Sequence, residues 1–149
     1  MSYETLFQIF NLGVLPFWAL LILLPNARVT EVLVHSALIP AIYGVAYITF
    51  LVIATTGDGP AGDFSSLEGI MVGFASPVGM LAGWIHYLVF DMFVGAWEAR
   101  DAKRHGISHW VMIPILILTL MAGPLGLLIY VILRGVTRQV WGLREPDAA

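Results

Sequence analysis

His86 and Asp91 are the side chains in this sequence that packing explains least well, because both lie in an apolar stretch long enough to cross a bilayer. The stretch runs from Pro77 to about Trp97, and about 20 apolar residues are needed to span the hydrocarbon core. An ionised side chain at such a depth costs about 2.5 kcal/mol or more. Unless a cation is near, burial keeps a carboxyl group protonated. A protonated Asp91 is a proton donor, so the stretch predicts a functional acid.

The spacing of these two residues limits what they can do together. On a helix, His86 and Asp91 lie about 140° apart around the axis and about 7.5 Å apart along it. They are therefore poor joint ligands for one metal ion, but they can address two points of a long ligand or two neighbouring helices. The alternative is a packing role, in which both hydrogen-bond across the helices to Asn11, Tyr43 or Tyr47. We favour function for Asp91 and leave both interpretations open for His86.

Other titratable residues are weaker candidates. His35 and His109 are expected at the ends of two helices, and with Glu98 or Asp101 they would offer the nitrogen and oxygen ligands that zinc or iron accepts. Their spacing matches no known ligand motif. We therefore predict no metal site, with these four residues as the weak candidates, and the sequence indicates no particular cofactor.

Three acids on the third apolar stretch share one helix face. Asp91 and Glu98 are seven residues apart, and Asp101 follows three residues later, so an acidic stripe runs from the middle of the membrane to its surface. The stripe is either a proton path or, as we favour, a solvated helix end. In that second interpretation Glu98 and Asp101 pair with the basic residues of segment 100–104.

Composition places these residues in a membrane protein. The 149 residues are 59% hydrophobic and 11% charged, whereas soluble domains are about 25% charged. We expect an all-α integral membrane four-helix bundle that forms a single transmembrane domain over residues 1–149. The predicted spans are residues 5–24, 32–54, 77–97 and 110–133.

Glycine and proline mark the boundaries between the predicted helices. A glycine-rich acidic loop follows the second span, and a short surface or re-entrant helix is expected at 65–74, before the third span. The third helix carries Gly79 and Gly83, which allow a neighbouring helix to approach closely. Gly123 and Pro124 should kink the fourth helix, and a helical tail should follow residue 134.

Several functional classes are excluded by composition. There is no cysteine and there is no clustered basic surface, so disulfides and nucleic-acid binding are not expected. The N-terminus lacks a positive region and a cleavage site, so the first stretch is expected to be a retained helix. Basic residues divide four against three between the two sides of the membrane, so orientation stays undecided.

Two segments carry a family resemblance. Residues 83–93 read GWIHYLVFDMF, residues 123–130 read GPLGLLIY, and Trp97, Asp101 and His109 lie between them. With these residues the chain resembles the abscisic-acid-deficient-four-like family over nearly its whole length, including Asn11 and segment 64–67. Plant members of that family are plastid membrane proteins required to make neoxanthin from violaxanthin. That isomerisation opens an epoxide and forms an allene.

The resemblance implies a carotenoid or a similar long isoprenoid as ligand. Epoxide opening with loss of a carbon-bound proton needs an acid and a base in a dry site. We expect Asp91 to be the acid and His86 the base, in an enzyme of the carotenoid isomerase or epoxide-opening type. The residues expected to bind the substrate are Asn11, Tyr43, Tyr47, Phe90, Phe93 and Trp97, with the last three stacking on the polyene.

Two other functions stay open at this point. The protein could hold a carotenoid or lipid without converting it, or it could be a small proton-coupled carrier with Asp91 as the relay. Four helices are few for a carrier unless the protein forms a homo-oligomer. The expected partners are membrane lipid and the isoprenoid. Residues 96–101 read AWEARD in the bacterial style, and no transit peptide precedes the first stretch, so we expect a bacterial inner membrane protein.

Overall fold

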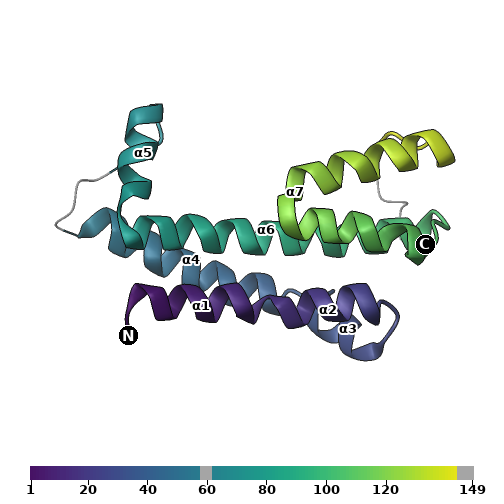
Figure 1. Cartoon of the computed structure of the whole chain (residues 1–149), viewed down its shortest axis with the longest axis horizontal. Helices are drawn as coiled ribbons and strands as arrows, with labels where there is room; N and C mark the ends of the chain where they lie inside the picture. The colour runs from purple at the N-terminus through teal and green to yellow at the C-terminus, as the bar shows by residue number, and fades with distance from the viewer. Residues whose placement is uncertain (58–61, 144–149) are drawn as a thin grey trace. The chain divides into compact units, whose positions relative to one another are not determined.

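The computed structural model describes residues 1–57 and 62–143, and within these ranges it is helical and contains no strand (Figure 1). The helices are α1 Tyr3–Gly13, α2 Leu15–Leu23, α3 Arg28–Leu33, α4 Leu38–Thr56, α5 Leu67–Ala75, α6 Pro77–Arg104 and α7 His109–Arg138. Four helical stretches are long and apolar enough to cross a membrane, namely Tyr3–Leu23, Arg28–Thr56, Pro77–Arg104 and His109–Arg138. The prediction of an all-α membrane protein with four span-length helices and a short helix before the third is confirmed.

The helices run beyond the ends of the predicted spans. The third, for example, continues from residue 97 to Arg104. A span that is predicted by counting apolar residues ends near the first charged residue. Backbone hydrogen bonding in the helix does not depend on that charge and continues into the polar sequence. Helix α7 continues four residues past 134 and ends at Arg138, because Gln139 adopts a left-handed conformation with φ 59°. Residues 139–143 are not helical, and the rest of the predicted helical tail lies outside the described residues.

The chain forms two compact units, residues 1–93 and residues 94–149, and α6 contributes to both. The first unit joins α1 to α6 by a hydrogen bond of 3.0 Å from Trp84 Nε1 to Asn11 Oδ1. It joins α4 to α1 by a bond of 3.0 Å from the Tyr43 hydroxyl to the Phe10 carbonyl oxygen. Through these two bonds, α1 holds both α4 and the first part of α6 in place. Ser66 caps α5 by accepting a bond from Gly69 N, and α5 is set at an angle to the beginning of α6 (Figure 1).

In the second unit, α7 folds back on itself. Ala122 has non-helical angles of φ −155° and ψ 55°, two residues before Pro124. The kink predicted at Gly123 and Pro124 is therefore confirmed, and it reverses the direction of the helix (Figure 1). The two halves, 109–121 and 123–138, are about 20 and 24 Å long at 1.5 Å per residue. A Cβ atom at Gly126 would overlap the side chain and backbone of Thr119, so a glycine is needed where the halves meet.

Candidate functional site

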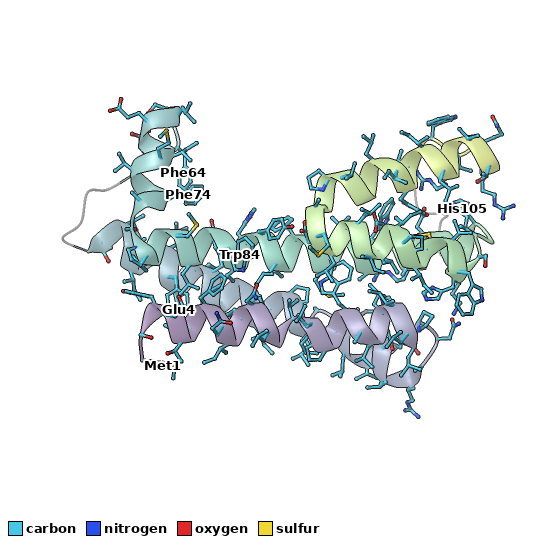
Figure 2. All side chains as sticks on the ribbon, viewed as in Figure 1. Met1, Glu4, Phe64, Phe74, Trp84 and His105 are labelled. Carbon is cyan, nitrogen blue, oxygen red and sulfur yellow. The ribbon has the colours of Figure 1, made fainter. Side chains whose placement is uncertain are left out.

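A cavity of about 250 Å³ lies within the first unit. Its walls come from α4, the segment before α5, α5 itself and the first turns of α6. The wall is mostly apolar, and its larger side chains include Tyr47, Leu51, Phe64, Ile70, Phe74 and His86. Figure 2 labels Phe64 and Phe74 beside α5, and both residues line the cavity.

Glycines bring α5 close enough to α6 to form this cavity. A Cβ atom on Gly83 would lie 2.6 Å from Cε1 of Phe74, and one on Gly79 would overlap the carbonyl oxygen of Gly73. The close approach predicted for Gly79 and Gly83 is therefore present, and the element that approaches is α5. Ser76 stabilises the corner between the two helices, because its hydroxyl accepts a bond of 3.1 Å from Gly79 N.

His86 lines the cavity from α6. Its ring lies 5.5 Å from the ring of Tyr47 between centroids and stacks on Phe90 at 4.5 Å with an interplanar angle of 29°. Both His86 and Phe90 are exposed on the surface of the first unit. An exposed surface of a membrane-spanning helix faces lipid or a neighbouring helix, and His86 lies both on this surface and on the cavity wall.

Asp91 lies elsewhere on the same helix. It is buried, with 9% of its surface exposed, and it does not line the cavity beside His86. This separation is the one expected from the rotation of about 140° between positions five residues apart. The structure therefore brings the predicted base to a cavity and places the predicted acid inside the helix packing.

The residues predicted to bind substrate divide into three groups. Tyr47 lines the cavity, and Phe90 lies beside it through its stacking on His86. Asn11 accepts a bond from Trp84, and Tyr43 donates to the Phe10 carbonyl oxygen, so these two side chains take part in joining α1 to α6 and to α4. The other two do not line this cavity: Phe93 is 55% exposed, and Trp97 lies in the second unit.

The acids at the end of α6 are buried, so the interpretation as a solvated helix end is wrong, whereas the expected pairing of Asp101 with Arg104 is present at 3.5 Å. Glu98 is 0% exposed and Asp101 is 5% exposed. Oδ2 of Asp101 accepts a bond of 2.6 Å from Arg134 Nη1 and a further bond from the Tyr130 hydroxyl. Oε2 of Glu98 accepts a bond of 2.8 Å from the Thr119 hydroxyl. The reversal of α7 brings these partners to α6, and no local pattern in the sequence shows that reversal.

Arg134 completes this buried cluster. Its guanidinium carbon lies 5.7 Å from the centre of the Trp97 ring and 5.8 Å from that of Tyr130, and the residue is 1% exposed. Nη2 also donates to the carbonyl oxygen of Gly142 at 2.9 Å. The cluster ties both halves of α7 to α6, so it is a structural element of the second unit.

The four weak metal candidates are divided between the two units of the chain. Within the described residues, no three His, Cys, Asp or Glu side chains are arranged to hold a metal ion. His35 follows α3 in the first unit, and His109 begins α7 in the second. Glu98 and Asp101 are bonded to the residues of α7 described above.

Asp63 lines the same cavity as His86, and it was not among the predicted site residues. Its Oδ1 accepts bonds from the Ser65 hydroxyl at 2.5 Å and from Ser65 N at 2.8 Å. These bonds lower the pKa of Asp63 below its ordinary value, so the side chain is an ionised carboxylate at neutral pH. An Asp two residues before a Ser is a common turn pattern, but only the folded chain shows that this turn borders a cavity.

Comparison with known proteins gives two findings. The sequence model of the family described as ABA DEFICIENT 4-like matches residues 5–130. The chain is 31% identical over 114 residues to the protein ABA DEFICIENT 4, chloroplastic, of Arabidopsis thaliana. That match covers 72% of this chain, which spans about half the length (50%) of that relative. No solved structure matches. The relative's chloroplast location gives no support to the expected bacterial inner membrane.

Proposed function

The chain belongs to the ABA DEFICIENT 4-like family, and from this premise we propose that it binds a carotenoid or a similar long isoprenoid and isomerises it beside His86. The observation that carries the proposal is a cavity with apolar walls, in a membrane protein, with an imidazole on its wall. Apolar walls with a few polar groups are the usual features of a small-molecule site. The membrane supplies such a ligand directly from lipid.

The size of the cavity limits how the ligand is held. Pockets that enclose drug-sized molecules measure about 300 to 1,000 Å³, and this cavity measures about 250 Å³. It therefore takes one end group of a long isoprenoid rather than the whole molecule. The polyene leaves the cavity past His86 and Phe90, whose stacked rings offer an aromatic surface.

In the proposed reaction, His86 is the base and Asp91 is the acid. The imidazole removes a proton from carbon, the electron pair of that C–H bond forms a new double bond, and the epoxide C–O bond breaks. The oxygen takes a proton from the acid and becomes a hydroxyl, so the product is an isomer of the substrate. The position of His86 on the cavity wall supports its role. The role of Asp91 rests on its burial and on its place on the same helix.

A second function is pigment holding without conversion. It is favoured by one observation, that Asp91 does not line the cavity that His86 lines. In that case the cavity and the His86–Phe90 surface retain the ligand, and no proton is transferred.

The two functions are separated by expression in a host that makes carotenoids, followed by purification in mild detergent. We would record the absorption spectrum and the extracted pigments for the wild type, His86→Ala and Asp91→Asn. His35→Ala is the matched control, since this histidine does not line the cavity. An isomerised pigment with the wild type and the control, lost in His86→Ala, supports the enzyme. Bound but unchanged pigment in every sample supports the holder, and absence of bound pigment overturns both.

A further inference from the structure

We infer that one end of the second unit, formed by Lys103, Arg104 and Arg138, binds the headgroup of an anionic membrane lipid. We call these three residues the basic end. The inference is independent of the proposed function, because the cavity that His86 lines belongs to the first unit. It follows from the reversal of α7, from the burial of the charged residues, and from the distribution of Lys and Arg along the chain.

The reversal of α7 brings the three cations together. Lys103 and Arg104 lie in the last turn of α6, whereas Arg138 is the last residue of α7. Nη2 of Arg138 donates a bond of 2.5 Å to the carbonyl oxygen of Gly106, in the turn that follows α6. The backbone N of Gly106 donates in turn to the Lys103 carbonyl oxygen at 3.2 Å. Both ends of α7 therefore lie beside the end of α6 (Figure 1).

The charged residues of the second unit differ in burial. Asp101 is buried and accepts a bond from the buried Arg134. Lys103 and Arg138 are exposed, and Arg104 keeps 33% of its side chain exposed beside Asp101. The bond from Arg138 goes to a neutral carbonyl oxygen, so it orients the guanidinium without neutralising its charge. The basic end therefore presents positive charge at the surface, although the whole chain has a net charge of −3.

The same reversal changes how the cations are divided between the two sides of the membrane. If α7 crossed the membrane, the basic residues would divide almost evenly. Because α7 returns to the side on which it begins, the crossings that remain are Tyr3–Leu23, Arg28–Thr56 and Pro77–Arg104. All Lys and Arg residues within 1–57 and 62–143 then belong to one side, namely Arg28, Arg100, Lys103, Arg104, Arg134 and Arg138. Membrane proteins keep such an excess on the cytoplasmic side, where the leaflet carries anionic lipids.

Two tryptophans place the basic end at the level of the headgroups. Trp110 follows the turn after α6 and is 82% exposed, and Trp141 follows the end of α7 and is 59% exposed. Exposed tryptophan is enriched at the interface between hydrocarbon and water. Lys and Arg at this depth attract anionic lipids, and a guanidinium offers several N–H donors to phosphate oxygens. The charge of the basic end therefore selects anionic lipid over zwitterionic lipid.

The test measures lipid binding to the full-length protein in an uncharged detergent. Phosphatidylglycerol, which is anionic, and phosphatidylcholine, which is zwitterionic, carry the same fluorescent acyl chain and are titrated separately. Binding is followed by fluorescence anisotropy. The variants are Lys103→Gln, the double variant Lys103→Gln with Arg138→Gln, and Arg138→Lys, which keeps the charge. Arg28→Gln is the matched control, because it removes an exposed cation of the first unit.

Each Lys or Arg near the surface contributes about fivefold to the affinity for anionic lipid. The wild type, Arg138→Lys and Arg28→Gln should therefore bind phosphatidylglycerol about 25-fold more tightly than phosphatidylcholine, as two such cations imply. Lys103→Gln should reduce this preference about fivefold, and the double variant should abolish it.

Three results would overturn the inference. They are equal affinities of the wild type for the two lipids, an unchanged preference in the double variant, and an equal loss of preference in Arg28→Gln. Displacement of phosphatidylglycerol by an equal concentration of inorganic phosphate would assign the basic end to free phosphate instead of lipid, and would also overturn it.

Discussion

Arg138 is the last residue of the 30-residue helix α7, yet its Nη2 donates a hydrogen bond of 2.5 Å to the carbonyl oxygen of Gly106, three residues before that helix begins. A straight helix of this length would separate its ends by about 45 Å. The bond is possible because α7 reverses at Ala122. Each half is then shorter than the roughly 30 Å of hydrocarbon that a spanning helix must cross.

The first prediction concerns the ends of α7. We expect residues before and after this helix to lie on the same side of the membrane, as in a re-entrant hairpin. The chain contains no cysteine, so single variants Ser108→Cys and Gln139→Cys can be labelled with an impermeant thiol reagent in oriented vesicles. Both should react from the same side. Met121→Cys, near the reversal, should react poorly because it lies in the hydrocarbon, and labelling of 108 and 139 from opposite sides would contradict the hairpin.

The second prediction concerns the buried pair Arg134 and Asp101. Removing one member of a buried ion pair leaves the other charge without compensation and typically costs about 3 to 5 kcal/mol. Arg134→Leu should therefore lower the free energy of unfolding by an amount of this order, measured by denaturation in detergent. The double variant with Asp101→Leu should lose less than this single variant.

Arg104→Gln is the control for this pair. Arg104 lies 3.5 Å from Oδ1 of Asp101, and its side chain is 33% exposed. Exposed ion pairs contribute about 0 to 1 kcal/mol, so the variant should be nearly as stable as the wild type. Equal losses for Arg104→Gln and Arg134→Leu would show that the buried position of Arg134 has no special importance.

The third prediction concerns the contact between the halves of α7. Gly126→Ala should destabilise the second unit, because the added methyl group would overlap Thr119. Overpacking of this kind costs roughly 1 to 3 kcal/mol or more. Gly44→Ala is the comparison, since nothing lies within 4 Å of a Cβ atom there, and alanine is favoured over glycine in a helix. Thermal unfolding should distinguish the two, and equal melting temperatures would refute the close packing at Gly126.

The fourth prediction is a pH dependence from Asp63. Hydrogen bonds from Ser65 lower the pKa of Asp63 in the folded protein, so its charged form is fully present above about pH 4. The charge is lost as the pH falls through the lowered pKa. Ser65→Ala removes the side-chain bond, raises that pKa, and should move the loss to higher pH. The measurement is a pH titration of the Asp63 carboxyl group by NMR between about pH 2.5 and 6, and identical titrations in the wild type and Ser65→Ala would contradict the role of Ser65.

Much of the secondary structure of this protein could be predicted from local sequence. Apolar length predicted the four span-length helices, and the pair Gly123 and Pro124 predicted the break in the last one, because both depend on backbone chemistry within a few residues. The helical repeat also placed His86 and Asp91 on different sides of α6. These properties need no knowledge of how distant segments meet.

Only the tertiary structure decided which residues meet across loops. The two partners of Asp101 on α7 lie 29 and 33 residues further along the chain, and they reach it because the break in α7 is a full reversal rather than a bend. The angle of such a break depends on packing around Gly126 and Thr119, which no periodicity encodes. Likewise, Asp63 borders the cavity of His86 because glycines let its segment lie against α5. Two segments that are distant in sequence can approach closely only where the side chains of both leave enough space. A local sequence pattern describes one segment and does not show which other segment it meets.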